Sequence, residues 1–462
     1  MTAHETPPGR ASSLLAAVFT VGVAGFGGGS ALIPIFDSEV VAKRGLLRPG
    51  QFLRHTVVAN LTPGALPVKL AAAAGVTVGG WQLSVLAALL VALPGALATV
   101  GLLALADALG PDAVRLISYA SVGITAFIVV LLIGYITKVH VQAGPRLAAY
   151  GVITLVSALA VGGHEIVTLV SRLTGLAWEW PLPRLNALQL ILVSLALIVA
   201  WSLWSGRRGA RTHPDPPSGS EPEQTPPAPA ASGKTTAGGT GFGRTVARAT
   251  AAWIMVALVG FGLFMALHPE GAELGGLLAA SSVSSFGGGE AYVGVADGFF
   301  VRAGFADRTL FYTQLVPIAN ALPGPILVKI AAGIGYLAGL PAGPAAAWAL
   351  AAAACLATIG ACCAVALPVL GTYERMKNHP IVVNIGHYIL PVICGLLVSV
   401  CATMFHVSAD VGETAGVPAL PLLATMLAAI TLMTWLHLRT RVPDLLMLVV
   451  AGGASLALLL AA

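Results

Sequence analysis

The sequence predicts an all-α polytopic membrane protein built from two inverted structural repeats. Hydrophobic residues make up 57% of the chain and charged residues only 9%, a balance that no soluble globular class shows. Apolar stretches of about 20 residues, long enough to cross a bilayer as helices, recur along the whole chain. One 50-residue stretch also occurs twice. We therefore expect broken or re-entrant helices, with about 9 full crossings plus four hairpin-like segments among up to about 13 hydrophobic segments.

The repeated stretch runs from Phe26 to Gly75 and returns 260 residues later, from Phe286 to Gly335. The alignment needs no gap, and 17 of the 50 positions are identical. Each copy opens with Phe-Gly-Gly-Gly, reaches an asparagine before a Pro-Gly step, and then carries a lysine in a Val-Lys-(Leu/Ile)-Ala-Ala run. The chain therefore holds two copies of one unit.

The second half of the chain holds one more hydrophobic segment than the first half. The first repeat, residues 1–206, is expected to hold six such segments, at about 11–35, 52–75, 81–106, 116–139, 146–163 and 187–206. Residues 207–243, rich in Pro, Gly, Ser and Thr, are predicted to be a flexible linker. An extra transmembrane helix is expected within 244–270, around Trp253. The second repeat, residues 271–462, then supplies the segments at about 274–296, 311–337, 343–370, 381–406, 417–437 and 443–462.

The extra helix predicts that the copies are inverted. A six-segment repeat ends on the side where it began, so one further crossing makes the second copy enter from the opposite side. An amino terminus and linker placed in the cytoplasm put most Lys and Arg residues inside, as the positive-inside rule requires. The carboxyl terminus then lies outside, and the plasma (inner) membrane is the expected location.

One basic loop decides between two topologies for the first two segments. Lys43, Arg44, Arg48 and Arg54 lie between them and would face outward if both segments crossed fully. Hairpins broken at the triple glycine and at 62–67 keep this loop inside, which the rule favours. The matched loop around Arg302 would then lie outside.

The repeated glycine and proline breaks predict a central substrate site. Broken backbone survives in hydrocarbon only where it faces protein or lines an aqueous cavity. Glycine amides approach a ligand closely, and the positive end of a helix that begins there suits an oxyanion. Close helix packing by small residues is the alternative. The paired occurrence in two inverted copies favours the site.

Lys69 and Lys329 are the strongest candidates for substrate-binding side chains. A charge at membrane depth is costly unless it is paired or solvated, so a lysine there is expected to have a function. Two symmetry-related cations would suit a doubly charged anion. The alternative is that each lysine side chain snorkels, so that its amine reaches the headgroup region and has no role in binding. Asn60 and Asn320 either donate to the same ligand or cap helix ends.

The copies differ directly after the glycines, where Ser30 is replaced by Glu290. A carboxylate beside an anion site repels the substrate unless it is protonated, so Glu290 is either a proton-coupling group or a wet carboxylate at a cavity mouth. The matched pairs Asp37/Asp297 and Arg48/Arg308 are interpreted as loop-facing structural residues.

The predicted substrate-binding set follows these motifs: Gly27, Gly28, Gly29, Ser30, Asn60, Pro63, Gly64, Lys69, Gly287, Gly288, Gly289, Glu290, Asn320, Pro323, Gly324 and Lys329. No nucleophile–base pair and no metal-like spacing of the five cysteines is found, so no enzyme activity, catalytic residue, metal or cofactor is expected. No basic run is interleaved with aromatics, so no nucleic-acid partner is expected either.

In combination, these motifs resemble the chromate ion transporter family. The resemblance is carried by Phe26-Gly27-Gly28-Gly29, by the charged loop with Lys43-Arg44-Gly45, and by Pro323-Gly324-Pro325. It covers both halves, as in the two-domain (long-chain) members, and leaves out the linker and the extra helix. It implies export of chromate, and for some members transport of sulfate or a related oxyanion. The first copy departs from the pattern, with Pro63-Gly64-Ala65 in place of Pro-Gly-Pro.

Electrostatics favour export, because a dianion gains energy by leaving a negative-inside cell. An uptake or exchange carrier for sulfate-like anions is the alternative, and a membrane-embedded enzyme or flippase is a remote one. The expected partners are chromate or a sulfate-like oxyanion and membrane lipid, with a homodimer left open.

Overall fold

The computed structural model describes residues 8–25, 32–174, 185, 187–209, 240–268, 271–286, 289–376, 379–439 and 443–461. In the first copy, its main helices follow the chain in this order: α1 (Pro8–Ala24), α2 (Ile33–Phe36) continued by the π-helix η2 (Asp37–Lys43), α3 (Pro49–Leu61), α4 (Leu66–Gly79), α5 (Trp81–Leu109), α6 (Pro111–Val141), the short turn η3 (Gly144–Arg146), α7 (Leu147–Thr174) and α8 (Ala187–Gly209).

The second copy repeats this order after one additional helix, α9 (Thr240–Leu267). Its elements are α10 (Ala272–Val283), α11 (Gly289–Ala296), η5 (Asp297–Val301), α12 (Arg308–Leu310), η6 (Phe311–Leu315), α13 (Val316–Ala321), α14 (Ile326–Gly339), η7 (Leu340–Ala342), α15 (Pro344–Met376), α16 (Pro380–Thr414), α17 (Ala419–Arg439) and α18 (Asp444–Ala461). Within the described ranges every regular element is a helix, which confirms the all-α prediction.

Eight of the described helices are long and apolar enough to cross a membrane: α5, α6, α7, α9, α15, α16, α17 and α18. Within α8 the apolar run Gln189–Trp204 is just short of this length. The predicted polytopic membrane fold is therefore confirmed. The long helices also extend beyond the hydrophobic cores expected from the sequence, since α6 has 31 residues and α16 has 35.

The first two segments of the first copy are hairpins of half-helices. Arg10, at the start of α1, donates from Nη2 to the carbonyl of Leu46, just after η2, at 3.1 Å. The start of α1 and the end of η2 therefore lie side by side, so the chain turns back between them. In the second hairpin, His55 Nε2 on α3 lies 3.1 Å from the Thr77 hydroxyl near the end of α4.

The second copy turns back at the matched places. Ser281 on α10 and Tyr292 on α11 bring their hydroxyls to 2.9 Å across the glycine break. Gly333 on α14 packs so closely on η6 that an added Cβ would lie 2.2 Å from Leu315 Cδ1. The chain thus folds back into a short hairpin at each of the four predicted breaks. This is the geometry that the charges of the basic loop favoured.

The two copies pack reciprocally. α4 packs on α5 of its own copy and on α15 of the other, while α14 packs on α15 and on α5. Matched glycines allow this packing within each copy, because a Cβ on Gly75 or on Gly335 would lie 2.5 Å from the backbone of α5 or α15, respectively. Exchanging the copies therefore maps one set of contacts onto the other.

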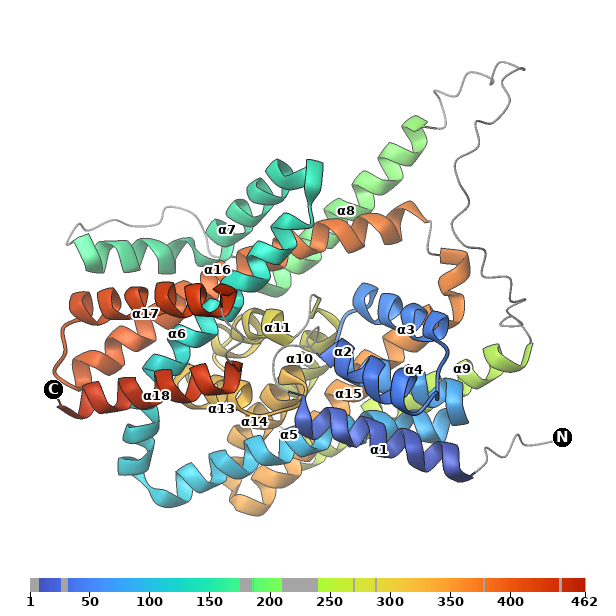
Figure 1. Ribbon diagram of the computed structural model, residues 1–462, viewed down its shortest axis with the longest axis horizontal. Coiled ribbons are helices and arrows are strands. Elements are labelled where there is room, and N and C mark those ends of the chain that lie inside the picture. Colours follow the sequence, from blue (N-terminus) through green and yellow to red (C-terminus); the bar gives the residue numbers. More distant parts are fainter. Residues whose placement is uncertain are drawn as a thin grey trace.

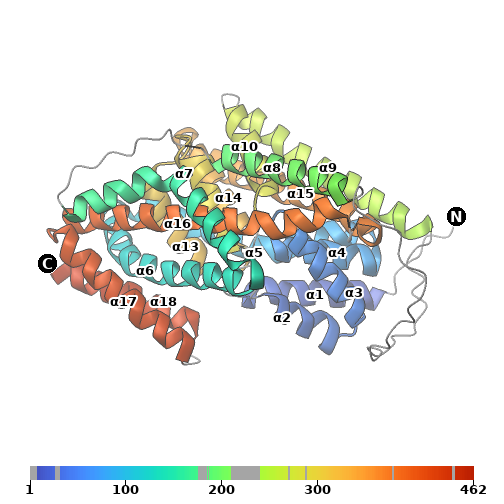
Figure 2. The ribbon, with the colours of Figure 1, turned by 90° about the horizontal axis from the view of Figure 1, so that it is seen from above.

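The ends of the chain lie at opposite ends of the molecule. α1 begins at the right of Figure 1, at the end where α8 stops and α9 starts, and α18 finishes at the left. Figure 2, turned by 90°, shows the same separation. The loop after η5 in the second copy lies against α7, since Arg302 Nη1 donates to the carbonyl of Val161 at 2.8 Å. The inversion of the copies itself stays a prediction.

Candidate functional site

Two backbone hydrogen bonds join the breaks of one copy to those of the other. The N–H of Gly64 donates to the carbonyl of Ser285 at 2.7 Å, and the N–H of Gly324 donates to the carbonyl of Gly25 at 2.9 Å. The two donors, Gly64 and Gly324, occupy matched positions of the two copies, and so do the two acceptors, Gly25 and Ser285. Gly25 and Ser285 directly precede the two Phe-Gly-Gly-Gly motifs. The structure therefore brings each Pro-Gly break to the entrance of the opposite glycine motif.

Glycine is required at both Pro-Gly breaks. Gly64 has φ +106° and Gly324 has φ +94°, a left-handed conformation that other residues adopt only with strain. A Cβ on Gly64 would also lie 2.2 Å from Cys362 Cβ on α15. On the reciprocal side α5 presents Gly95, where a Cβ would lie 2.3 Å from the carbonyl oxygen of Pro323. Each break is thus pressed against a long helix of the other copy.

Both predicted lysines are buried at these breaks, Lys69 with 2% and Lys329 with 1% of its surface exposed. Lys69 Nζ donates to the carbonyl of Ala59 at 2.6 Å and also to that of Thr62. Lys329 Nζ donates to the carbonyl of Leu322, the match of Thr62, at 2.5 Å. These carbonyls end α3 and α13, where the helix dipole is negative and oxygens lack helical partners. Neither amine snorkels outward.

Lys329 keeps donor capacity. An ammonium group has three N–H donors, and one of them serves Leu322. Its side chain lines a cavity of about 20 Å³ together with Asn320 and Asp444. Such a volume holds about one water molecule, so a tetrahedral oxyanion cannot enter this conformation unless the breaks move apart.

The two predicted asparagines behave alike. Asn60 Nδ2 donates to the carbonyl of Thr56, and Asn320 Nδ2 donates to that of Val316, both at 2.8 Å. Each side chain therefore bonds one turn back on its own half-helix. In this conformation one N–H of each amide is occupied, and the second remains for a ligand.

Part of the predicted set lies outside the described residues: Gly27, Gly28, Gly29, Ser30, Gly287 and Gly288. α11 begins at Gly289, with Glu290 in its first turn. The roles of these residues remain predictions. Pro63 and Pro323 stand directly before the two break glycines, as the sequence indicated.

A polar cavity that the sequence analysis missed lies toward the other end of the second copy. It measures about 360 Å³ and is lined by Glu165, Leu185, Asp297, Val301, Arg302, Arg308 and Thr403. Asp297 is not loop-facing, because it is 2% exposed and accepts hydrogen bonds from Arg302 Nε at 2.6 Å and from the Tyr312 hydroxyl at 2.8 Å. That interpretation was wrong. Arg302 and Tyr312 are Ala42 and Phe52 in the first copy, a difference that pointed to a special role of the second.

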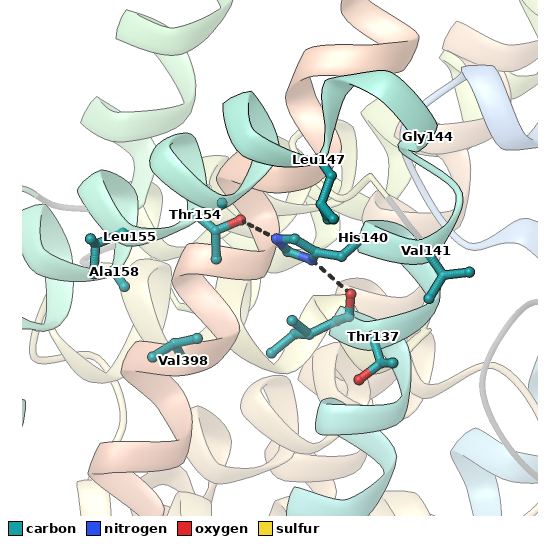
Figure 3. Close-up of a pocket in the computed structure, with 11 residues that line it drawn as sticks. Thr137, His140, Val141, Gly144, Leu147, Thr154, Leu155, Ala158 and Val398 are labelled. Carbon is teal, nitrogen blue, oxygen red and sulfur yellow. Dashed lines mark hydrogen bonds between the residues drawn. The ribbon is translucent and has the colours of Figure 1, made fainter.

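A cavity of about 620 Å³ lies between α6, α7 and α16 (Figure 3). His140 and Thr154 are among its few polar lining residues. The His140 ring nitrogens lie 2.8 Å from the carbonyl of Ile136 and 3.3 Å from the Thr154 hydroxyl, as the dashed lines in Figure 3 mark. None of its eleven described lining residues is a lysine or an arginine, so it lacks the charge that a dianion site requires.

Comparison with known proteins adds an independent line of evidence. The chain is 38% identical over 90 residues, 20% of its length, to the uncharacterized transporter YwrA of Bacillus subtilis (strain 168). It is 35% identical over 101 residues, 22% of its length, to the uncharacterized transporter YwrB of the same organism. The chain spans about half the length of these curated relatives, 51% of each. No solved structure matches it.

A family model described as "Chromate transporter" matches residues 12–206 and again residues 272–457. The first match ends where the predicted linker begins, and the second starts just after α9. The matches thus fall on the two copies found in the sequence and cover most of the chain. The chain belongs to the chromate transporter family, with one family unit in each of its two copies.

Proposed function

We propose that the chain is a secondary transporter that exports chromate, a tetrahedral oxyanion, across the plasma membrane by alternating access. The observation that carries this proposal is the reciprocal pair of hydrogen bonds, Gly64 to Ser285 and Gly324 to Gly25. Broken helices that meet between two inverted copies are the usual setting of a transporter's substrate site.

The substrate site lies at this junction. A dianion stripped of water needs charge-assisted donors, each worth about 1.5–3 kcal/mol. Lys69 and Lys329 supply the charge, and the amides of Gly27–Gly29 and Gly287–Gly289 supply close backbone donors. Ser30, Asn60 and Asn320 complete the polar lining, with Pro63, Gly64, Pro323 and Gly324 shaping the two breaks.

Exchange between two conformations opens the site to each side in turn. The cavity beside Lys329 has a volume of about 20 Å³, which supports a closed site in the described conformation. Because the copies are matched and inverted, a movement that loosens the break of one copy has a mirror movement in the other. The first copy opens toward the linker side, which is cytoplasmic, and the second copy opens toward the outside.

Charge determines the direction of net transport. One elementary charge gains about 2.3 kcal/mol per 100 mV, so a dianion gains about 4.6 kcal/mol by leaving a negative-inside cell. Glu290 stands in the first turn of α11, directly after the glycines. Its carboxylate is the candidate for proton coupling, since it must be protonated or moved when the anion binds.

Counterflow in proteoliposomes tests the proposal. Vesicles are loaded with unlabelled chromate, sulfate or phosphate, and the entry of labelled chromate is followed against protein-free vesicles. Chromate is expected to drive the strongest counterflow, sulfate a weaker one and phosphate the weakest. Counterflow driven best by sulfate would support the sulfate-type carrier instead. Equal traces with and without protein would contradict oxyanion transport altogether.

A further inference from the structure

We propose that the polar cavity between α7, η5, α12 and α16 is a second oxyanion site, a vestibule at the external mouth. Arg308 receives the anion there, and Glu165 is the counter-ion that the anion displaces. The inference rests on the proposed function for its orientation and its substrate class. Two arginines line the same cavity, Arg302 and Arg308. The inference rests on the difference in how many hydrogen bonds each of them makes to the protein.

Arg302 uses all three of its guanidinium nitrogens to bond the protein. Its Nε bonds Asp297 Oδ2 at 2.6 Å, its Nη1 bonds the carbonyl of Val161 at 2.8 Å, and its Nη2 bonds the Ser399 hydroxyl at 2.8 Å. These bonds tie the end of η5 to α7 and α16. Arg302 therefore holds the wall of the cavity and has little capacity for a ligand.

Arg308 makes fewer bonds to the protein than Arg302 does. Its described ion pair, from Nη2 to Glu165 Oε2, is long at 3.2 Å. Its Nε is shielded from solvent and has no hydrogen-bond partner among the described residues. A guanidinium carries five N–H donors arranged to grip an oxyanion by two at once. The Arg308 side chain as a whole is 40% exposed, so the guanidinium N–H groups that the protein does not use remain available to an anion in the cavity.

The cavity suits a hydrated oxyanion in size and charge. Its volume of about 360 Å³ corresponds to about twelve water molecules at about 30 Å³ each. The carboxylate of Asp297 already neutralises Arg302, which leaves Glu165 as the counter-ion of Arg308. A dianion competes for Arg308 with twice the charge of this carboxylate, and the Glu165 side chain can turn away when it loses.

The vestibule lies close to the central junction. Asp297 directly follows α11, whose 8 residues begin at Gly289. At 1.5 Å per residue, α11 spans about 12 Å. One short half-helix thus separates the vestibule from the second glycine motif, so an anion released there lies on the way out.

The position in the first copy that matches Arg308 is not part of such a cavity among the described residues, so it supplies a matched control. Arg48 is the counterpart of Arg308, but it is exposed and its backbone N–H binds Gln51 Oε1 at 3.0 Å. It lies on the linker side of the molecule, near the start of α1. A change at Arg48 therefore removes the same charge without touching the vestibule.

Protection of an introduced thiol tests the site directly. Val301→Cys places a thiol in the cavity wall, and a membrane-impermeant thiol reagent is applied outside intact cells. Sulfate is the protecting anion, because chromate would oxidise the thiol. We expect sulfate to slow the labelling. Adding Arg308→Gln should raise the half-protecting concentration at least tenfold, adding Glu165→Gln should lower it severalfold, and adding Arg48→Gln should leave it unchanged.

The outcomes separate this site from the proposed function. Unchanged protection in the Arg308→Gln variant, no protection at all, or a thiol that does not react from outside would each overturn the vestibule, even if chromate counterflow is intact. The expected protection pattern without chromate counterflow would keep the vestibule and overturn chromate export. If Val301→Cys does not fold, Leu185→Cys places the thiol in the wall of the same cavity. Protection of that thiol by sulfate is then the measurement that supports or overturns the vestibule.

Discussion

Lys69 and Lys329 have one role that the structure shows and a second role that we propose. Each amine donates a hydrogen bond to the carbonyl that ends the preceding half-helix. The proposed second role is to supply positive charge to the substrate at the junction of the copies. The matched Val-Lys context revealed both residues in the sequence. Their acceptors were not predictable, because backbone carbonyls carry no sequence signature.

Replacing the lysines with methionine keeps the stem and removes the charge. Lys329→Met should raise the apparent KM for chromate about 30-fold, the equivalent of about 2 kcal/mol. Lys69→Met should also lower the free energy of unfolding by about 1–3 kcal/mol, because two buried carbonyls lose their donor. Transport per unit of folded protein, together with thermal denaturation in detergent, separates the two effects. An unchanged KM in both variants would leave the lysines a purely structural role.

The two break glycines should differ in their tolerance of alanine. Both Gly64→Ala and Gly324→Ala force a side chain into a left-handed conformation, a cost of about 1–3 kcal/mol. Gly64→Ala also collides with Cys362, whereas the nearest atom to a Cβ on Gly324 is 3.4 Å away. We expect Gly64→Ala to lower the Tm more, and Cys362→Gly to restore part of that loss. Gly101→Ala on α5, where a Cβ would meet nothing within 4 Å, is the control. Equal losses in the two variants would show that Cys362 does not press on the break.

At the scale of the elements, four of the expected hydrophobic segments each fold as a hairpin of short helices. The basic loop of the first copy predicted this, because a crossing would have placed its charges outside. The π-helical turns η2, η5 and η6 were not predictable. Such turns depend on how tertiary packing widens a helix, and no residue type marks them. The polar cavity beside Arg308 was missed for a related reason, since its lining comes from four separate stretches, near 165, 185, 297–308 and 403.

Thiol labelling distinguishes hairpins from crossings. Ala42→Cys, exposed at the end of η2, should react only from the cytoplasmic side, and Ala303→Cys, exposed after η5, only from outside. The hairpins keep each loop on the side where its repeat began. Labelling of position 42 from outside would mean that the first two segments cross the membrane fully.

At the scale of the whole molecule, α9 is a long helix between the copies without a matched helix in the first copy. If α5 to α8 each cross the membrane, the first copy ends on the side where it began, and α9 then carries the chain across once more. The inversion of the second copy stays a prediction from the repeat and this unmatched helix. The sequence did not predict which atoms join the copies, because both reciprocal bonds link backbone groups.

The inverted architecture predicts where the linker and the carboxyl terminus lie. Cysteines placed within 207–243 should react only from the cytoplasm, and Ala461→Cys at the end of α18 only from outside. Figure 1 shows the flanks of the linker and the end of α18 at opposite ends of the molecule. Reaction of both positions from the same side would contradict the inversion.

The central claim is that chromate crosses the membrane through the junction of the two breaks. The most direct test is chromate efflux from loaded proteoliposomes under an imposed potential, with Lys329→Met beside the unmodified protein. We predict that efflux accelerates as the vesicle interior becomes more negative, and that the variant shows the same potential dependence at a much lower rate. Efflux equal to that of protein-free vesicles, or equal in protein and variant at limiting chromate, would contradict the account.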